Sequence, residues 1–384
     1  MKMQSTYIPI LKAKEGELDA LGCLFESTRN NLKPWFDVPQ ITDKDKEKFK
    51  GKNVSVVEAF LTNIAHAISK VWKHRDAYVD LPLWAPNAQT EGGEHVIQFF
   101  CKQAEHFGVR VTPVVDCMRW DDPIYVYAFK GLTHKADKEV ILRLVMNVDS
   151  AEEMAEEDEF LARLEDIAAT LNYDPRATAV MIDFGDVTSA KYEIPKITTQ
   201  AERVIEIFRR AGHQKFVVSG CSIGAYISSV VPLPSTEKTV PRKEMLAWKS
   251  IVSLQGFKDV GFSDYGVRGP GSLVSGGAGN QNGKIRYTIQ DGYFIARGYQ
   301  LKTGEKGGQY YGLAQKIIDS GYYEGPEFSW GDKELLDCSH WAFRGLASKW
   351  IAIDTTHHVE YVLKEVEEFK RQRVIVEARS VAGV

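Results

Sequence analysis

Three carboxylates lie at or near the ends of short apolar runs, where they could act as acids, bases or metal ligands. These residues are Asp37, Asp183 and Asp264. Carboxylates that converge bind a divalent cation through oxygen ligands, or act as an acid and a base when their environments separate their pKa values. We therefore expect all three to be catalytic, with a divalent cation as the candidate cofactor and Asp37 and Asp183 as its ligands. A single strand-end Asp more often only caps the next helix or loop.

Two cations complete this candidate site. Lys12 ends the first apolar run and precedes Glu17, so it is either a nucleophile or anion anchor, or half of a salt bridge that fixes the first loop. Arg143, within the segment ILRLVMN, is expected to hold either the acidic cluster or an anionic substrate. We count Lys12 among the catalytic residues and Arg143 among the substrate-binding residues.

A Gly-rich segment offers a possible phosphate site. Residues 269–283 precede Lys284 and Arg286, so backbone amides and two cations could surround a phosphate. The segment lacks the G-K-[ST] ending of a P-loop, and a surface loop is the plain alternative. Arg286 is expected to bind substrate.

Residues 220–224, Gly-Cys-Ser-Ile-Gly, fit the G-x-S-x-G pattern of a nucleophile elbow around Ser222. The segment that follows, AYISSVVPLP, does not predict the helix that must support such a nucleophile, so we expect Ser222 to contact substrate instead. Asp264 with His340, His357 or His358 would complete a triad in the order Ser, acid, His. His357 and His358 are expected at the start of the last helix, and adjacent histidines point in different directions from a helix, so both cannot easily serve one metal ion.

The elements that position these residues alternate between short apolar runs and longer amphipathic stretches, which predicts a (β/α)8 barrel of the TIM-barrel type. Eight strands are expected at 7–12, 32–38, 76–81, 109–117, 140–147, 177–184, 215–219 and 261–267. Helices are expected at 17–25, 54–72, 94–107, 153–171, 198–211, 242–253, 334–345 and 355–368. Several strands end on an ionisable or polar residue, namely Lys12, Asp37, Asp80, Asp116, Asp183 and Ser219. These ends meet at one mouth of a barrel, where the fold places its active site.

The pattern changes after the eighth strand. Residues 268–331 are Gly-rich and contain two alternating segments around Gln290-Asp291-Gly292, which predicts an insertion with a β-hairpin. We treat residues 1–384 as one barrel domain that includes this insertion. The alternative, an open doubly wound sheet, would need a G-x-G-x-x-G turn after an early strand, and none follows those strands.

The composition excludes some classes of protein. A formal net charge of −4 argues against bulk nucleic-acid binding. The five cysteines are far apart and form no C-x-x-C pair, which indicates free thiols in a reducing compartment. Neither a signal peptide nor a run long enough to span a bilayer is present in the sequence, so the expected location is cytoplasmic and away from membranes.

Short motifs along most of the chain are similar to those of the beta protein family, known from T-even bacteriophage and widespread in bacterial genomes. They include YIPILKAKEGELDAL, LKPWFDVP, FSDYG, IRYT and FSWGDKELLDC, with Trp350 and His357-His358 near the end. The family-typical positions with usable chemistry are Lys12, Glu17, Asp37, Ser222, Asp264, Tyr265, Arg286, Tyr287 and His358. The resemblance adds His358 to the catalytic residues and Tyr265 and Tyr287 to the substrate-binding residues. It also implies a phage or antiviral defence context.

Three functions fit these observations. The leading hypothesis is a barrel enzyme, a hydrolase or lyase, that acts on a small anionic or nucleotide-like substrate. The first alternative is a non-catalytic barrel that recognises a phage or host macromolecule, with a protein as its partner, through residues 268–331. The second is a glycoside-type hydrolase with a carboxylate pair flanked by aromatic side chains.

Overall fold

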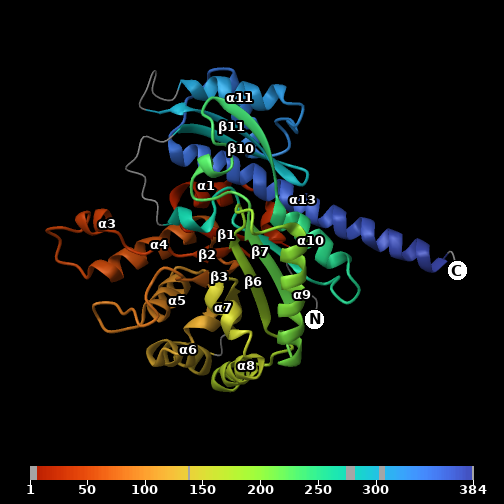
Figure 1. Ribbon diagram of the computed structural model, residues 1–384. Coiled ribbons are helices and arrows are strands. Elements are labelled where there is room, and N and C mark those ends of the chain that lie inside the picture. Colours follow the sequence, from red (N-terminus) through yellow and green to blue (C-terminus); the bar gives the residue numbers. More distant parts are fainter. Residues whose placement is uncertain (1–6, 137–138, 274–281, 302–307, 383–384) are drawn as a thin grey trace.

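The computed structural model describes residues 7–136, 139–273, 282–301 and 308–382, and its central feature is a closed barrel of eight parallel strands (Figure 1). The barrel strands are β1 (Tyr7–Lys12), β2 (Trp35–Asp37), β3 (Asp76–Asp80), β4 (Arg110–Asp116), β5 (Ile141–Val145), β6 (Ala179–Asp186), β7 (Lys215–Cys221) and β9 (Gly261–Asp264). Pairing of β1 with β9, Tyr7 opposite Phe262, closes the ring. The predicted barrel and all eight of its strands are confirmed.

Alternate residues of each strand face two different hydrophobic cores. On β1, Tyr7 and Leu11 pack in the larger core between the barrel and its helices, whereas Ile8 and Ile10 pack inside the barrel. The inner core continues with Trp35, Val114, Ile141, Met181 and Val217. Because side chains alternate with a period of two, the next inward positions at the strand ends are Lys12, Asp37, Arg143 and Asp183. An apolar layer therefore lies directly below the ionisable residues.

Helices cover the outside of the barrel between successive strands (Figure 1). They are α1 (Glu15–Cys23), α2 (Glu26–Asn30), α3 (Asp43–Glu47), α4 (Val56–Trp72), α5 (Val96–His106), α6 (Pro123–Ala136), α7 (Val148–Glu153), α8 (Glu157–Leu171), α9 (Ile194–Arg210) and α10 (Lys243–Ser253). Gly108 and Gly212 follow α5 and α9 with φ of +85° and +91°, the left-handed geometry that favours Gly after a helix. The sequence did not predict α6, whose first turn, Pro-Ile-Tyr-Val, is rich in β-branched and aromatic residues typical of strands.

The described residues of the predicted insertion form a subdomain together with segments on either side of it. Most of the Gly-rich segment, residues 274–281, lies outside the described residues, and so does the predicted phosphate site there. The subdomain contains β8 (Thr236–Pro241), β10 (Asn282–Ile289) and β11 (Gly292–Gln300), which pair in the order β10-β11-β8. The helices α11 (Gln309–Asp319), α12 (Trp330–Ser339) and α13 (Ala347–Ala382) complete it. The predicted hairpin is confirmed, since Ile289 pairs with Gly292 and Asp291 adopts a φ of +58° in the turn. Tyr293 and Ile295 pack in the same core as the barrel interior, so this sheet covers part of the C-terminal end of the barrel.

The last helix differs from the prediction in length and position. It begins at Ala347 rather than at residue 355, so His357 and His358 lie well inside it and not near its start. Both histidines are buried. In Figure 1, α13 runs from the subdomain past the barrel, and it packs against α1, α12 and β10.

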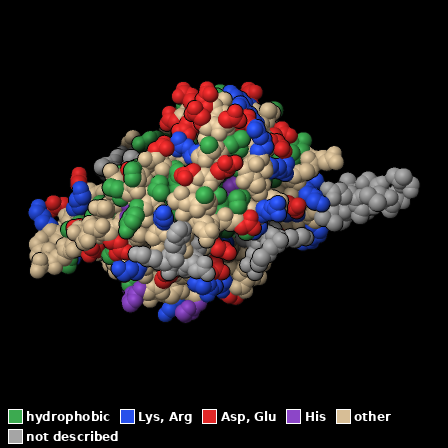
Figure 2. Space-filling view, turned by 90° about the horizontal axis from the view of Figure 1, so that it is seen from below, with side chains coloured by type: hydrophobic (Ala, Val, Ile, Leu, Met, Phe, Trp, Pro, Cys, Tyr) green, Lys and Arg blue, Asp and Glu red, His purple; other side chains and the backbone are tan. Residues whose placement is uncertain are grey.

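The surface seen from below carries mixed charges. Acidic side chains gather along the upper edge of this view, and Lys and Arg are spread over several parts of the visible face (Figure 2). Among the helices of the described ranges, none has both the length and the apolar character needed to cross a bilayer.

Candidate active site

Arg143 is the centre of a buried polar cluster at the C-terminal end of the barrel. Its Nη1 donates to Asp37 Oδ1 at 3.2 Å and to Asp80 Oδ2 at 2.6 Å. Its Nε and Nη2 donate to Asp183 Oδ2 at 3.1 and 2.6 Å, and Nη2 also donates to the Tyr265 hydroxyl at 2.6 Å. Side chains from β2, β3, β5 and β6 and from the residue after β9 therefore meet around one guanidinium group.

Asp37 is the member of this cluster best suited to exchange a proton near neutral pH. Burial raises the pKa of Asp37 to about 6, although the Arg143 guanidinium acts in the opposite direction. Its Oδ1 accepts hydrogen bonds from Trp35 Nε1 at 3.0 Å and from Arg143. A proton on Asp37 would therefore be carried by Oδ2. A carboxyl group with such a pKa can serve as either a general acid or a general base.

Tyr265 joins Arg143 to Asp183. The Tyr265 hydroxyl accepts from Arg143 and donates to Asp183 Oδ2 at 2.5 Å. All three side chains are buried, with Asp183 fully inaccessible. Charged hydrogen bonds of this kind fix the orientation of their partners.

The cluster becomes more exposed toward β3 and β4. Asp116, at the end of β4, is paired with Arg119 at 3.2 Å, and these side chains are 15% and 20% exposed. Asp80 is 7% exposed and borders a cavity of about 10 Å³ that Trp84 and His95 also line. That volume is close to the space that one water molecule needs.

Lys12 lies on the other side of the mouth, next to a group of cations. Its Nζ is 3.9 Å from Glu17 Oε1 and donates to the carbonyl oxygen of Arg268. Burial lowers the pKa of Lys12, while Glu17 and Asp37 act to raise it and Arg268 to lower it further. The second oxygen of Glu17 is buried without a hydrogen bond in the part of the chain that the structure describes. The salt bridge weighed as the alternative role of Lys12 is therefore present.

Lys284 and Arg268 form no direct ion pair within the described ranges, although Asp354 acts on the charge of Lys284 and Glu17 on that of Arg268 from farther away. Burial, together with repulsion from Arg286 and Arg268, lowers the pKa of Lys284 to about 8. Among the described residues, neither Lys284 nor Arg268 has a carboxylate within 4 Å of its charged nitrogens. Arg286, by contrast, donates from Nη1 to Asp354 at 2.8 Å and from Nε to the Val267 carbonyl.

Asp264 and His358 form a separate buried pair between the barrel and the subdomain. His358 Nε2 lies 3.0 Å from Asp264 Oδ2, and its Nδ1 lies 2.8 Å from the Thr288 hydroxyl. Burial alone would raise the pKa of Asp264, but His358 and hydrogen bonds from Gly266 and Tyr7 hold it below its usual value. Neither residue contacts the Arg143 cluster through a hydrogen bond.

Tyr287 and His357 belong to the subdomain. Their rings stack at 3.8 Å, and the Tyr287 hydroxyl donates to Asp332 Oδ1 at 2.6 Å. His357 Nδ1 lies 2.9 Å from Asp332 Oδ2, and its Nε2 lies 2.8 Å from the Thr288 carbonyl. Both ring nitrogens thus face oxygen atoms of the protein, which fixes the orientation of the ring.

Ser222 is placed away from any histidine in the described structure. Its hydroxyl donates to Glu244 and accepts from the Lys243 amide at 2.8 Å. The next residues form a short 3-10 turn at Ile227–Ser229 and then β8, so no supporting helix follows. Burial raises the pKa of Glu244 to about 7, although the Ser222 hydrogen bond opposes this.

Comparison with known protein families shows to which family the chain belongs. The model of the family described as "Beta protein" matches residues 7–364. The chain belongs to the Beta protein family. The match starts at the first residue of β1 and ends within α13, so this family model includes both the barrel and the subdomain. No curated protein matches this member of the Beta protein family.

The family match does not address metal binding. Within the residues described for this Beta protein family member, no group of three or more His, Cys, Asp or Glu side chains is placed to hold a metal ion. Arg143 supplies positive charge between Asp37 and Asp183, the two residues expected to bind a cation.

Sequence reasoning missed several residues of these clusters in this family member. From the sequence, Arg268 stands out only as the start of the predicted insertion, and Asp332 and Asp354 do not stand out at all. One available signal was the spacing of Asp354, His357 and His358 on α13, which places polar side chains on a helix face that also contains Val359 and Val362. A charged residue within such an apolar stripe usually has a buried partner.

Proposed function

We propose that this protein is an enzyme that transfers protons on a small anionic substrate at the C-terminal end of the barrel. The observation that carries the proposal is the convergence of Asp37, Asp80, Asp183 and Tyr265 on Arg143. Active sites of this fold lie at this end and draw residues from several strands. A structural role alone would not require three carboxylates around one guanidinium, because buried charges are costly to desolvate.

The roles within the cluster follow from the hydrogen bonds and the pKa of Asp37. Asp37 gives and takes the proton, since its pKa of about 6 leaves both protonation states accessible near neutral pH. Arg143 and Asp183 hold the cluster rigid. Tyr265 donates its only hydroxyl proton to Asp183 and accepts from Arg143, so it keeps these two side chains in place.

The anionic part of the substrate binds at Arg268 and Lys284. Lys12 interacts electrostatically with both Arg268 and Asp37, and Arg268 in turn interacts with Lys284. A bound anion would neutralise the repulsion that lowers the pKa of Lys284. The substrate would then extend from this anion site, past Lys12, to Asp37.

A screen with matched variants tests this proposal. Wild type, Asp37→Asn and Lys284→Gln would be incubated with a panel of phosphorylated and carboxylated metabolites, and thermal shifts and mass changes of the panel would be measured. Asp43→Asn is the control, because its side chain is 98% exposed on α3. We expect one compound of the panel to stabilise wild type and the control, and both proteins to convert it. Asp37→Asn should bind this compound without converting it. Lys284→Gln should bind it at least tenfold more weakly. Conversion by Asp37→Asn at the wild-type rate would refute the assignment.

The first alternative, recognition of a macromolecule, is favoured by one observation on the subdomain. Trp341 is 70% exposed and Leu346 is 79% exposed, both between α12 and α13. Exposed large apolar side chains often mark contact sites. In pull-downs from phage-infected and uninfected cells, Trp341→Ser with Leu346→Ser would lose a specific partner if this function holds, and an unchanged set of partners would exclude it.

The second alternative, glycoside hydrolysis, has less support. Asp37 and Asp80 form a carboxylate pair near Trp35, as that mechanism requires. However, both carboxylates bind the same Arg143 nitrogen, which occupies space between them.

A further inference from the structure

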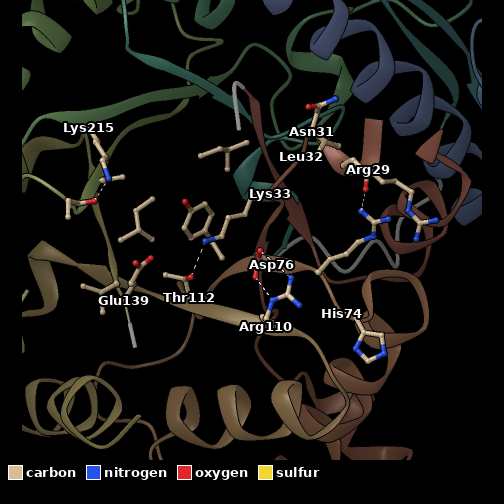
Figure 3. Close-up of a pocket in the computed structure, with 18 of the residues that line it drawn as sticks. Arg29, Asn31, Leu32, Lys33, His74, Asp76, Arg110, Thr112, Glu139 and Lys215 are labelled. Atoms are coloured by element: carbon tan, nitrogen blue, oxygen red, sulfur yellow. Dashed lines mark hydrogen bonds and ion pairs between the residues drawn. The ribbon is translucent and has the colours of Figure 1, made fainter. Parts of the chain in front are cut away.

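A second cavity lies at the opposite, N-terminal end of the barrel (Figure 3). Its volume is about 690 Å³, which is typical of small-molecule sites. Residues at the beginnings of the strands line it, including Ile8, Asp76, Arg110, Ala179 and Lys215. The proposed active site does not account for a cavity at this end.

The walls of this cavity are basic, although the chain as a whole is acidic. The lining contains two acidic residues, Asp76 and Glu139, and the whole chain carries a net charge of −4. Six lining residues are basic, namely Arg29, Lys33, Lys73, Arg75, Arg110 and Lys215. The concentration of positive charge in one concave place favours an anionic ligand.

Lys33 is the most informative of these cations. Its Nζ donates to the Thr112 hydroxyl at 3.0 Å and lies 3.9 Å from the centre of the Tyr78 ring. Burial lowers the pKa of Lys33, and within the described chain no carboxylate comes within 4 Å of its Nζ. A half-buried ammonium that contacts only a hydroxyl and a ring retains most of its capacity to bind an anion.

Arg110 and Lys215 are also weakly compensated, whereas Arg29 and Arg75 pair with Glu26. Arg110 pairs with Asp76 at 2.6 Å, but both side chains are more than half exposed, and such pairs contribute little. Lys215 donates to the carbonyl of Ala177 at 2.6 Å, which does not neutralise its charge. Figure 3 shows Lys33, Arg110 and Lys215 on different sides of the same space.

We propose that this cavity binds a small anion with two or more phosphate groups, either free or as part of a nucleotide. Several cations around one cavity match several phosphates better than one, and Arg forms paired hydrogen bonds with phosphate oxygens. The half-buried Tyr78 ring, with Lys33 over one face, offers an aromatic surface that a base can contact. The inner apolar core, which includes Ile10, Val114 and Met181, separates this site from the Arg143 cluster.

Titration calorimetry with sodium tripolyphosphate and with ATP, both without metal, tests this proposal. We expect binding to wild type and about tenfold weaker binding to Lys33→Met, Arg110→Gln and Lys215→Gln, because each loses one charged hydrogen bond. Lys46→Gln is the control for loss of a surface cation, since Lys46 pairs with Asp43 on α3. Lys284→Gln is the control for the proposed active site. Both controls should bind as wild type.

The outcomes separate the two sources of phosphate and the two proposed sites. Equal affinity for both probes supports a free polyphosphate, and tighter binding of ATP supports a nucleotide whose base contacts Tyr78. The proposal is overturned if neither probe binds, or if Lys284→Gln weakens binding and the cavity variants do not. Arg110→Gln changes an exposed side chain, so it tests the site even if Lys33→Met fails to fold.

Discussion

Arg143 and Asp183 make a two-nitrogen contact inside the barrel, with Nε and Nη2 at 3.1 and 2.6 Å from the same carboxylate oxygen. The two residues lie on the paired strands β5 and β6, and both are buried. This contact holds the guanidinium in the position from which it also reaches Asp37 and Asp80.

Replacing Arg143 should destabilise the fold strongly. Arg143→Met leaves three buried carboxylates without their shared cation, and loss of one partner from a buried ion pair typically costs about 3–5 kcal/mol. The control is Arg110→Met, because Arg110 forms an exposed pair with Asp76, and about 1 kcal/mol or less is expected there. Urea denaturation measures the unfolding free energy of both variants. An equal loss of unfolding free energy in the two variants would contradict a buried ionic centre around Arg143.

The raised pKa of Asp37 predicts a specific dependence of stability on pH. The pKa of Asp37 is about 6 in the folded state and lower in the unfolded state. The group therefore contributes its full stabilisation at pH values below the unfolded-state pKa. That contribution is lost as pH rises from about 4 to about 6, by up to about 3 kcal/mol. Asp37→Asn should lack this decrease. If wild type and Asp37→Asn show parallel curves of unfolding free energy against pH, the raised pKa is refuted.

The lowered pKa of Lys284 predicts that stability rises with pH in the alkaline range. Its folded pKa of about 8 is below the unfolded value, so its charge opposes folding below pH 8, and stability rises as pH increases from about 8 to about 10.5. Because the side chain is partly exposed, we expect Lys284→Met to stabilise the protein by only about 1–2 kcal/mol at pH 7. This gain should vanish near pH 10.5. If Lys284→Met were less stable than wild type at pH 7, the charge of Lys284 would not be destabilised by its neighbours.

The contact between α12 and α13 is tight enough to test with one methyl group. A Cβ at Gly331 would lie 2.3 Å from the backbone oxygen of Ile353, so Gly331→Ala should lower the melting temperature and cost about 1–3 kcal/mol. Gly312→Ala on α11 is the matched control, because a Cβ there meets no atom within 4 Å. It should stabilise the helix by up to about 1 kcal/mol. The reverse order of melting temperatures would contradict this packing.

The barrel and the strand-end residues could be predicted because apolar runs of strand length are strong local signals. Asp37 and Asp183 end such runs, and the fold itself brings the strand ends together. The sequence also placed Arg143 on a strand that faces this mouth.

The subdomain could not be predicted in the same way. The segment TEKTVP of β8 is mostly exposed and polar, so it lacks the alternation that indicates a strand, and it pairs with β11 more than fifty residues later. The pairs Asp264 with His358 and Arg286 with Asp354 join residues that are 94 and 68 positions apart. Local patterns carry no information on contacts of this range, which depend on the tertiary packing of α13.

The most direct test of the proposed function is a crystal structure of the protein with the compound that the metabolite screen identifies. We predict density for its anionic group against Arg268 and Lys284, with the remainder within hydrogen-bonding distance of Asp37 Oδ2. Density at the N-terminal cavity or on the outer surface alone, with the Arg143 cluster out of reach of the compound, would contradict an active site at the C-terminal end of the barrel.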